Sequence, residues 1–325
     1  MHPETVIRGL WGLVVVALIA CGGNAAPPSP RPTLQAPPAT TVEPEPELPD
    51  IAATAQLVDT ACPRVTGPYF YRVEKAGKVS HLLGTRHMSV SLDKMPKVVR
   101  DRLLAARLVV FETAPGDDSD AGLPEPDRRL SEALGDTLWK KYAALVGEDT
   151  AAMVDAAGPA TALVALMVLF EHKAALLDVE IERLVTDANI ETAGLETSAF
   201  QDRLLSELLD LRMLRTAIKG TPNRATLRKA SMEDLAEYCA GTDTDPGTDA
   251  SARAQLQVGG YSDAEIDTMD RKLLDDRNQA WLPQLETLLP RGDVVIVVGA
   301  DHLIGKRGLV ALLGAKGFRI TRVRP

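Results

Sequence analysis

The sequence predicts an α/β fold with a central sheet, in which an N-terminal β-hairpin and a C-terminal βαβ-like unit flank a large helical middle segment. The apolar runs 108–111 and 294–298 are continuous, which is typical of strands that helices bury on both faces. Strand-like segments lie near the two ends of the folded part, whereas residues 125–290 follow a mostly helical pattern. Strands and helices in this arrangement indicate a layered α/β core.

The first 20 residues have the layout of a bacterial secretion signal. Arg8 precedes the apolar stretch 10–20, which is far shorter than the roughly 20 apolar residues of a spanning helix. Residues 18–21, with the letters LIAC, resemble the lipobox of bacterial lipoproteins, which implies cleavage before Cys21 and acylation of its thiol. The alternative is an ordinary cleaved signal followed by an incidental cysteine. We expect a protein that is exported and lipid-anchored to the bacterial cell envelope, on its periplasmic or cell-surface side.

Residues 21–50 consist of this cysteine and a proline-rich tether. Nine prolines occur between residues 24 and 50, with little that is apolar between them. Such a segment is extended and semi-rigid, so we expect it to hold the folded part away from the membrane. Residues 51–325 then form the folded part, either as one large domain or as a core with an inserted lobe.

Charge and cysteine content limit the partners. The net charge is −9, and the basic residues are scattered among acids, so a nucleic acid is not expected as a partner.

If Cys21 is acylated, Cys62 and Cys239 remain, and an exported compartment permits a disulfide between them. Two buried thiols that pack as small apolar groups are the alternative.

The individual elements follow from local patterns. Residues 69–73 and 79–83 flank the turn-like segment 75–78, which predicts a β-hairpin. A helix at about 95–106 leads into the strand 108–111, and a short strand is expected near 193–195.

The closing unit and two further segments complete the prediction. The closing unit is a strand at 294–298, a helix at about 304–313 and a strand at 318–323. The apolar segment 160–170 is too short to span a membrane, and we expect a buried core helix there. Residues 241–249 have alternating acids but lack the glycine and glutamate positions of a calcium loop, so a solvated loop is expected.

Chemically active side chains follow the ends of four predicted strands. His87 and His302, two of the five histidines, end the segments GTRH and GADH, in which each follows a glycine by three positions. Glu112 directly follows the run 108–111, and Glu196 follows the short strand. In α/β sheets, ligands bind beyond the carboxyl ends of the strands. Two imidazoles and one or two carboxylates there can hold a divalent metal and leave a position open for water.

Metal binding would lower the pKa of that water, while a carboxylate outside the metal shell would transfer its proton. Each residue also has a structural explanation. Either histidine could cap a strand end, Glu112 could pair with an arginine, and Glu196 could cap the helix that follows it.

The order of these motifs resembles the TraB/PrgY/GumN family, whose wider relatives include the Tiki-type metalloproteases and the erythromycin-esterase-like and ChaN-like proteins. The segments that carry the resemblance are 71–73, 81–87, 109–112, 177–178, 194–197 with Gln201, 277–278 and 298–303 with Gly305. Together they extend over about residues 68–323, which is essentially the whole folded part.

The resemblance implies that His87, Glu112 and His302 hold the metal. It places Glu196, Arg277 and Asn278 close by as catalytic residues. We assign Arg277 to orienting a carboxylate or a substrate oxyanion, and Asn278 to a hydrogen bond that positions Arg277. These two residues are adjacent on a helix, so they point about 100° apart.

One position departs from the family pattern. The family usually has a small residue before the second histidine, where this chain has Asp301. Its carboxylate either lies near the metal or is a surface charge, which leaves the exact ligand set open.

The sequence therefore predicts a metal-dependent, peptidase-like hydrolase on the cell envelope, with a divalent metal of the Mn, Co or Zn type. Two alternatives stay open. One is a metal-independent hydrolase that resembles the erythromycin-esterase branch and uses a histidine base oriented by a glutamate. The other is a non-catalytic lipoprotein that sequesters a small peptide, as the pheromone-shutdown members of the family do. The expected partners are the membrane, through the lipid anchor, and a peptide or a small ester or amide substrate.

Overall fold

The computed structural model of the chain describes residues 51–117, 126–242 and 250–324. The predicted signal peptide (1–20) and the tether with Cys21 (21–50) lie outside the described residues. Most of the predicted loop at 241–249 lies outside them as well. Within the described ranges, no helix has the length and apolar character needed to cross a membrane.

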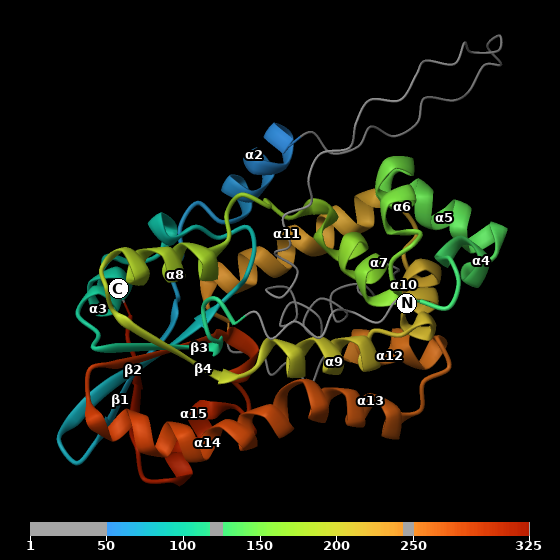
Figure 1. Cartoon of the computed structure of the whole chain (residues 1–325). Helices are drawn as coiled ribbons and strands as arrows, with labels where there is room; N and C mark the ends of the chain where they lie inside the picture. Colours follow the sequence, from blue (N-terminus) through green and yellow to red (C-terminus); the bar gives the residue numbers. More distant parts are fainter. Residues whose placement is uncertain (1–50, 118–125, 243–249, 325) are drawn as a thin grey trace.

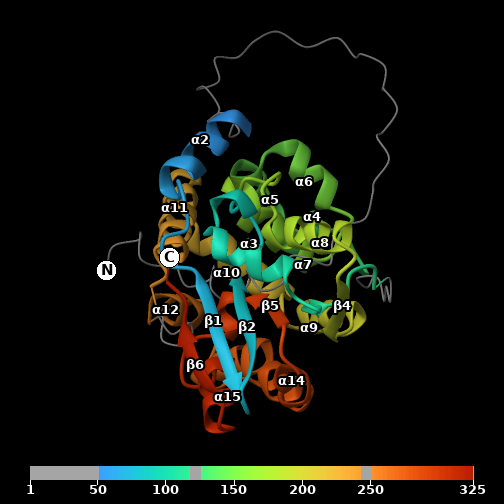
Figure 2. The ribbon, with the colours of Figure 1, turned by 90° about the vertical axis from the view of Figure 1, so that its left-hand side faces the viewer.

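The fold is built on a six-stranded sheet with the order β4-β3-β5-β2-β1-β6 (Figures 1 and 2). Neighbours among β4, β3, β5 and β2 pair in parallel, whereas β1 is antiparallel to both β2 and β6. The α/β prediction is confirmed. The strands are β1 (Tyr69–Lys75), β2 (Lys78–Thr85), β3 (Leu108–Thr113), β4 (Glu191–Glu196), β5 (Val294–Gly299) and β6 (Arg319–Arg322).

The predicted N-terminal hairpin is confirmed as β1 and β2. The strands pair from Tyr69 with Gly84 to Lys75 with Lys78. Ala76 and Gly77 connect them with φ of 52° and 76°. Positive φ at both central residues is the two-residue turn whose twist matches that of the flanking strands. Alanine rarely adopts this conformation, so the short connection and the pairing on either side enforce it.

The closing unit differs in two details from its prediction. β5 and β6 are parallel, as a βαβ unit requires, but β2 and β1 lie between them in the sheet. The intervening helix α15 (Leu309–Ala315) begins five residues later than expected. Gly305 has a φ of 78°, and this left-handed conformation interrupts a right-handed helix, so the segment before Leu309 forms turns instead.

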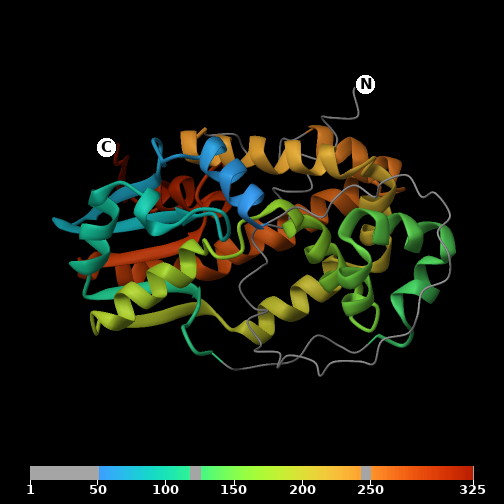
Figure 3. The same ribbon diagram turned by 90° about the horizontal axis from the view of Figure 1, so that it is seen from above.

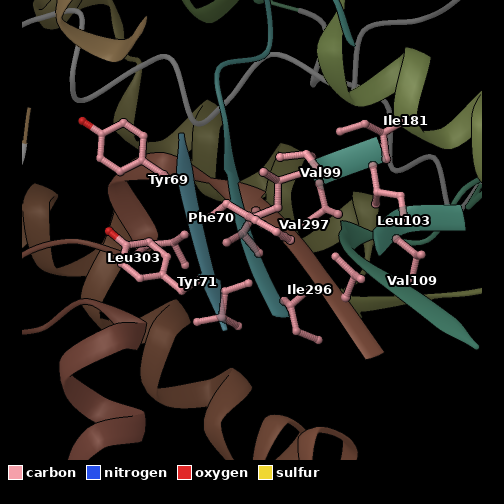
Figure 4. Close-up of a cluster of buried hydrophobic side chains, with 14 of the residues drawn as sticks. Tyr69, Phe70, Tyr71, Val99, Leu103, Val109, Ile181, Ile296, Val297 and Leu303 are labelled. Atoms are coloured by element: carbon pink, nitrogen blue, oxygen red, sulfur yellow. The ribbon is translucent and has the colours of Figure 1, made fainter. Parts of the chain in front are cut away.

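Helices cover both faces of the sheet (Figure 1). α3 (Lys97–Leu104) and α8 (Leu177–Asp187) lie on one face, and α14 (Asp276–Leu288) and α15 lie on the other. The predicted helix at 95–106 is thus found as α3. In Figure 4, Val99, Leu103 and Ile181 group beside Val109 and Val297 in the buried core between the first helix pair and the strands. Burial on both faces explains why β3 and β5 are apolar along most of their length.

The predicted helical middle forms a lobe with a second apolar core beyond the carboxyl ends of the parallel strands (Figures 1 and 3). The segment 160–170 is a buried helix, as predicted, formed by α7 (Pro159–Met167) and a 3-10 turn. Besides α8 and α14, which lie against the sheet, the middle segment contains α4 (Leu130–Leu134), α5 (Asp136–Val146), α6 (Glu148–Val154), α9 (Ser198–Leu208), α10 (Leu211–Gly220), α11 (Arg224–Ala240), α12 (Ala250–Val258) and α13 (Asp263–Asp270).

A disulfide joins Cys62, directly after α2 (Ile51–Ala61), to Cys239 in α11, with a Cα–Cα distance of 5.9 Å. The neighbouring Tyr238 hydroxyl donates a hydrogen bond to the Gly84 carbonyl oxygen at 3.0 Å. The bridge therefore ties the N-terminal segment to the helix that lies against the end of β2.

Candidate functional site

Four sequence-predicted site residues come together at the carboxyl ends of four neighbouring parallel strands. His87 follows β2, His302 follows β5, Glu112 lies near the end of β3, and Glu196 is the last residue of β4. Figure 1 shows the ends of β3 and β4 beside the start of α9, facing the helical lobe. Because parallel strands end at the same edge of a sheet, residues far apart in sequence share one region there.

Arg277, in the first turn of α14, lies at the centre of this cluster. Its Nη2 donates to Glu112 Oε2 and to Glu196 Oε1, both at 2.6 Å. Its Nε lies 3.1 Å from each Glu196 oxygen. One buried guanidinium thus neutralises two carboxylates through short, charge-assisted hydrogen bonds.

The remaining donors of Arg277 also have partners. Nη1 donates to the Leu273 carbonyl oxygen at 3.1 Å and to His302 Nε2 at 3.0 Å. Leu273 belongs to a single π-helical turn, η6 (Arg271–Asp275), that directly precedes α14. All five N–H groups of the guanidinium are therefore hydrogen-bonded, which fixes its orientation.

His302 is neutral, and its tautomer follows from its two partners. Asn278 Oδ1 can only accept, so His302 Nδ1 carries the proton and donates it at 2.7 Å. The unprotonated Nε2 then accepts from Arg277. Burial and the nearby Arg277 charge lower the pKa of His302 to about 3.

This contact corrects the role expected for Asn278. It does not bind Arg277 directly but holds the imidazole that Arg277 contacts. The two adjacent residues diverge along the helix, as predicted, and therefore reach opposite ring nitrogens of His302.

His87 forms a separate buried pair. Its Nδ1 donates to Asp178 Oδ2 at 2.8 Å, and the Thr85 hydroxyl donates to the other Asp178 oxygen at 2.6 Å. Burial lowers the pKa of His87, but the Asp178 carboxylate outweighs burial and raises the net value above the ordinary one. His87 Nε2 is buried and has no hydrogen-bond partner among the described residues.

The two glutamates have opposite protonation tendencies. Burial raises the pKa of Glu112, but Arg277 and the histidines lower it more, to about 2. The Gly299 N–H also donates to Glu112, at 2.7 Å. For Glu196, burial outweighs Arg277, and its pKa is raised. Two carboxylates with separated pKa values can take different roles in proton transfer.

A cavity of about 570 Å³ opens beside this cluster. It lies between α9, the π-helical turn with α14, and the end of β4. Glu196 and Arg277 line it, together with Trp281, whose Nε1 donates to Glu196 Oε2 at 3.2 Å. The cation and the carboxylate with the raised pKa are thus the cluster members that face this cavity.

The predicted metal ligands do not form a three-ligand metal site as they are arranged. Among the described residues, no group of three His, Cys, Asp or Glu side chains is placed to hold a metal ion. Arg277 already donates hydrogen bonds to Glu112 and to His302 Nε2. The distance from His302 Nε2 to Glu112 Oε1 is 3.7 Å. Of the three predicted ligands, only His87 resembles a metal-ligating histidine. Its Nδ1 donates to the Asp178 carboxylate, and its Nε2 has no hydrogen-bond partner among the described residues.

Asp178 and Trp281 are among the neighbours of the site that received no role from the sequence. Asp178 orients His87, but an acid in the first turn of a helix is ordinarily explained by the helix dipole. Trp281 binds Glu196 and lies 4.6 Å from the His302 ring, yet a tryptophan in an amphipathic helix is ordinarily a core residue. Asp178 lies in the segment 177–178 that carries the family resemblance, but nothing local pairs it with His87, and Trp281 has no signal in the local pattern.

Asp301 is partly buried rather than a fully exposed surface charge. Burial and the Asp234 carboxylate raise its pKa to about 7, against the opposing effect of His87 and Arg86. The position that departs from the family pattern therefore adds an acid near His87.

The TraB/PrgY/gumN family model matches residues 69–322. The chain belongs to this family. The match begins at the first residue of β1 and ends at the last residue of β6, so it includes the whole sheet, the helical lobe and the site. Searches of curated proteins and of solved structures find no match.

Proposed function

We propose that this TraB/PrgY/gumN-family protein is a hydrolase that cleaves an ester or amide bond, peptide bonds included. One observation carries the proposal: Glu196 and Arg277 belong both to the buried charged cluster and to the wall of the cavity. A substrate carbonyl group in the cavity would meet a fixed cation and a carboxylate of raised pKa at the same place. These are the groups that water activation and oxyanion stabilisation require.

In this mechanism, Glu196 accepts a proton from the attacking water and later donates it to the leaving group. Neutral Glu196 holds the guanidinium less strongly, which frees the N–H groups of Arg277 that point at it. Those donors then bind the oxyanion that forms in the same step. Glu112 and His302 keep their hydrogen bonds to Arg277 and hold it in place.

The metal-dependent form of the proposal has a divalent ion of the Mn, Co or Zn type at His87, Glu112 and His302. It requires Arg277 to release the two of these side chains that it holds. Metal content of the purified protein, measured with activity before and after chelation, separates the two forms. A stoichiometric metal whose removal abolishes turnover supports the metal-dependent form, whereas full turnover of the metal-free protein excludes it.

We also propose that the protein is exported and lipid-anchored to the cell envelope. The lipobox-like residues and the proline-rich tether support this location. The Cys62–Cys239 disulfide supports it independently, because structural disulfides persist in oxidising compartments and are rare in the cytosol.

The test of hydrolysis is Glu196→Gln, assayed on a panel of p-nitrophenyl esters and peptide p-nitroanilides. Loss of the proton acceptor should lower kcat by roughly 10²- to 10⁴-fold. Glu207→Gln is the matched control, because Glu207 is an exposed acid in α9 that lines the same cavity. Wild-type turnover by Glu196→Gln would disprove the role of Glu196.

His87 is the second candidate for the proton acceptor, because Nε2 has no hydrogen-bond partner in the part of the chain that the structure describes and Asp178 fixes the tautomer. Loss of turnover in His87→Ala, but not in Glu196→Gln, would transfer the role to His87 and favour the histidine-base form. Should wild-type protein bind peptides tightly and hydrolyse none of the panel, the peptide-sequestering alternative would replace the hydrolase.

A further inference from the structure

The wall of the cavity beside Glu196 and Arg277 is largely apolar. Its apolar lining residues come from the end of β4, from α9 and from α14: Leu195, Phe200, Leu204, Ala280 and Trp281. Phe200 is 42% exposed, although most large apolar side chains of the described residues are buried. An occupant that covers Phe200 would remove this apolar surface from water, which is favourable.

The charges around the cavity are already paired. Glu207 pairs with Lys272, and Asp276 pairs with Arg271 at 2.5 Å. The remaining charged lining residues, Glu196 and Arg277, pair with each other at 2.6 Å. Each charged lining residue thus has an opposite charge within the protein. The cavity therefore favours a neutral apolar group over an ionic one, because an ionic group would compete with these pairs.

We propose that this cavity binds a bulky apolar group, aliphatic or aromatic, next to the bond that is hydrolysed. Its volume of about 570 Å³ lies within the roughly 300–1,000 Å³ of small-molecule sites and accommodates a leucyl or phenylalanyl residue. The preferred substrates are then peptides, esters or amides with such a side chain or acyl group at that position. The link to hydrolysis depends on the proposed function, whereas the binding preference does not.

The experiment measures equilibrium binding of N-acetyl-phenylalanine amide and N-acetyl-alanine amide to the mature protein by calorimetry. Burial of the larger side chain should make the phenylalanine amide bind roughly 10-fold more tightly or better. Ala280→Trp fills the cavity from an exposed helix position and should abolish this preference. Gln279→Trp, at the exposed neighbouring position outside the lining, is the matched control and should keep it.

Phe200→Ala is a second variant, which removes part of the cavity wall instead of filling the cavity. It should reduce the preference for the phenylalanine amide several-fold. Circular dichroism checks that each variant keeps the wild-type fold. Equal affinity of the two amides for wild-type protein, or an unchanged preference in Ala280→Trp, would overturn the proposal.

The proposed hydrolysis and the proposed apolar specificity can be refuted independently of each other. If the phenylalanine amide binds as expected while Glu196→Gln keeps full turnover, the cavity assignment stands and the Glu196 mechanism is wrong. If Glu196→Gln is inactive while both amides bind equally, the hydrolase stands and the apolar specificity is wrong.

Discussion

Replacement of Arg277 by methionine tests the central claim about the site, that one buried guanidinium neutralises two carboxylates. Methionine keeps an unbranched side chain but is shorter and uncharged, so it leaves Glu112 and Glu196 buried without a cation. Removal of one partner from a buried ion pair costs about 3–5 kcal/mol, because the remaining charge is uncompensated. We therefore expect the free energy of unfolding of Arg277→Met to fall by about this amount at pH 8.

The pH dependence of this loss follows from Glu112. In the wild-type protein, the pKa of Glu112 falls from 4.5 to about 2 on folding, a shift that corresponds to about 3 kcal/mol. A lowered pKa contributes stability that is present above the unfolded value and lost as the pH falls through the folded value. Arg277 is the first of the groups that lower this pKa, so without it we expect burial to raise the pKa of Glu112 above its ordinary value. Stability should then fall as the pH rises.

The cost of Arg277→Met should consequently be largest at pH 8 and smallest near pH 4. Urea unfolding of both proteins at four pH values measures this difference. Arg271→Met is the matched control, because Arg271 lies six residues before Arg277 and makes an exposed ion pair with Asp276. Exposed pairs contribute about 0–1 kcal/mol, and the control should show little dependence on pH.

Arg277→Lys keeps the charge but cannot reproduce five hydrogen bonds with its three donors, so its stability should lie between those of wild type and Arg277→Met. If Arg277→Met costs less than about 1 kcal/mol at pH 8, or the same amount at every pH, the guanidinium does not hold the two glutamates together.

Three further predictions concern other parts of the chain. Reduction of the Cys62–Cys239 disulfide, or Cys239→Ser, should lower the free energy of unfolding by roughly 2–5 kcal/mol, as measured by urea unfolding, because the bridge closes a long loop. Two thiols that alkylate in the unreduced, denatured protein would rule the bridge out. Burial raises the pKa of Asp270 from 3.8 to about 6, so the folded state loses stability as the pH rises from about 4 to 6. Asp270→Asn should therefore raise the melting temperature at pH 8 but not at pH 4, and an equal effect at both values would contradict this. Cys21→Ser should release the protein from membranes or leave an unprocessed precursor, and wild-type fractionation and gel migration of this variant would refute the lipid anchor.

The architecture could largely be predicted from local patterns. Continuous apolar runs identified β3 and β5, and two strand-like segments on either side of a turn-like segment identified the hairpin of β1 and β2. The order of the strands could not be predicted, because β6 pairs with β1 at the edge although it follows β5 in sequence. Which edge a strand joins depends on contacts between residues far apart in the chain, and local patterns do not record these.

The candidate site, like the fold, could be predicted only in part. The positions of His87, Glu112, Glu196 and His302 at strand ends could be predicted, because the end of an apolar run and a following glycine are both local features. Their hydrogen-bond partners could not. Asp178 lies 91 residues from its partner His87, and Arg277 lies 165 residues from Glu112.

By itself, the sequence determined the α/β class, the family and the set of residues that gather at the strand ends. Only the tertiary structure decided which hydrogen bonds and ion pairs those residues form. It placed the guanidinium of Arg277 between two carboxylates and against His302, where the sequence predicted a metal ion. It also paired His87 with Asp178 and opened a cavity beside Glu196. The physical reason is that hydrogen bonds and pKa values depend on burial and on distances of a few ångströms, which only the packing of helices against the sheet edge determines.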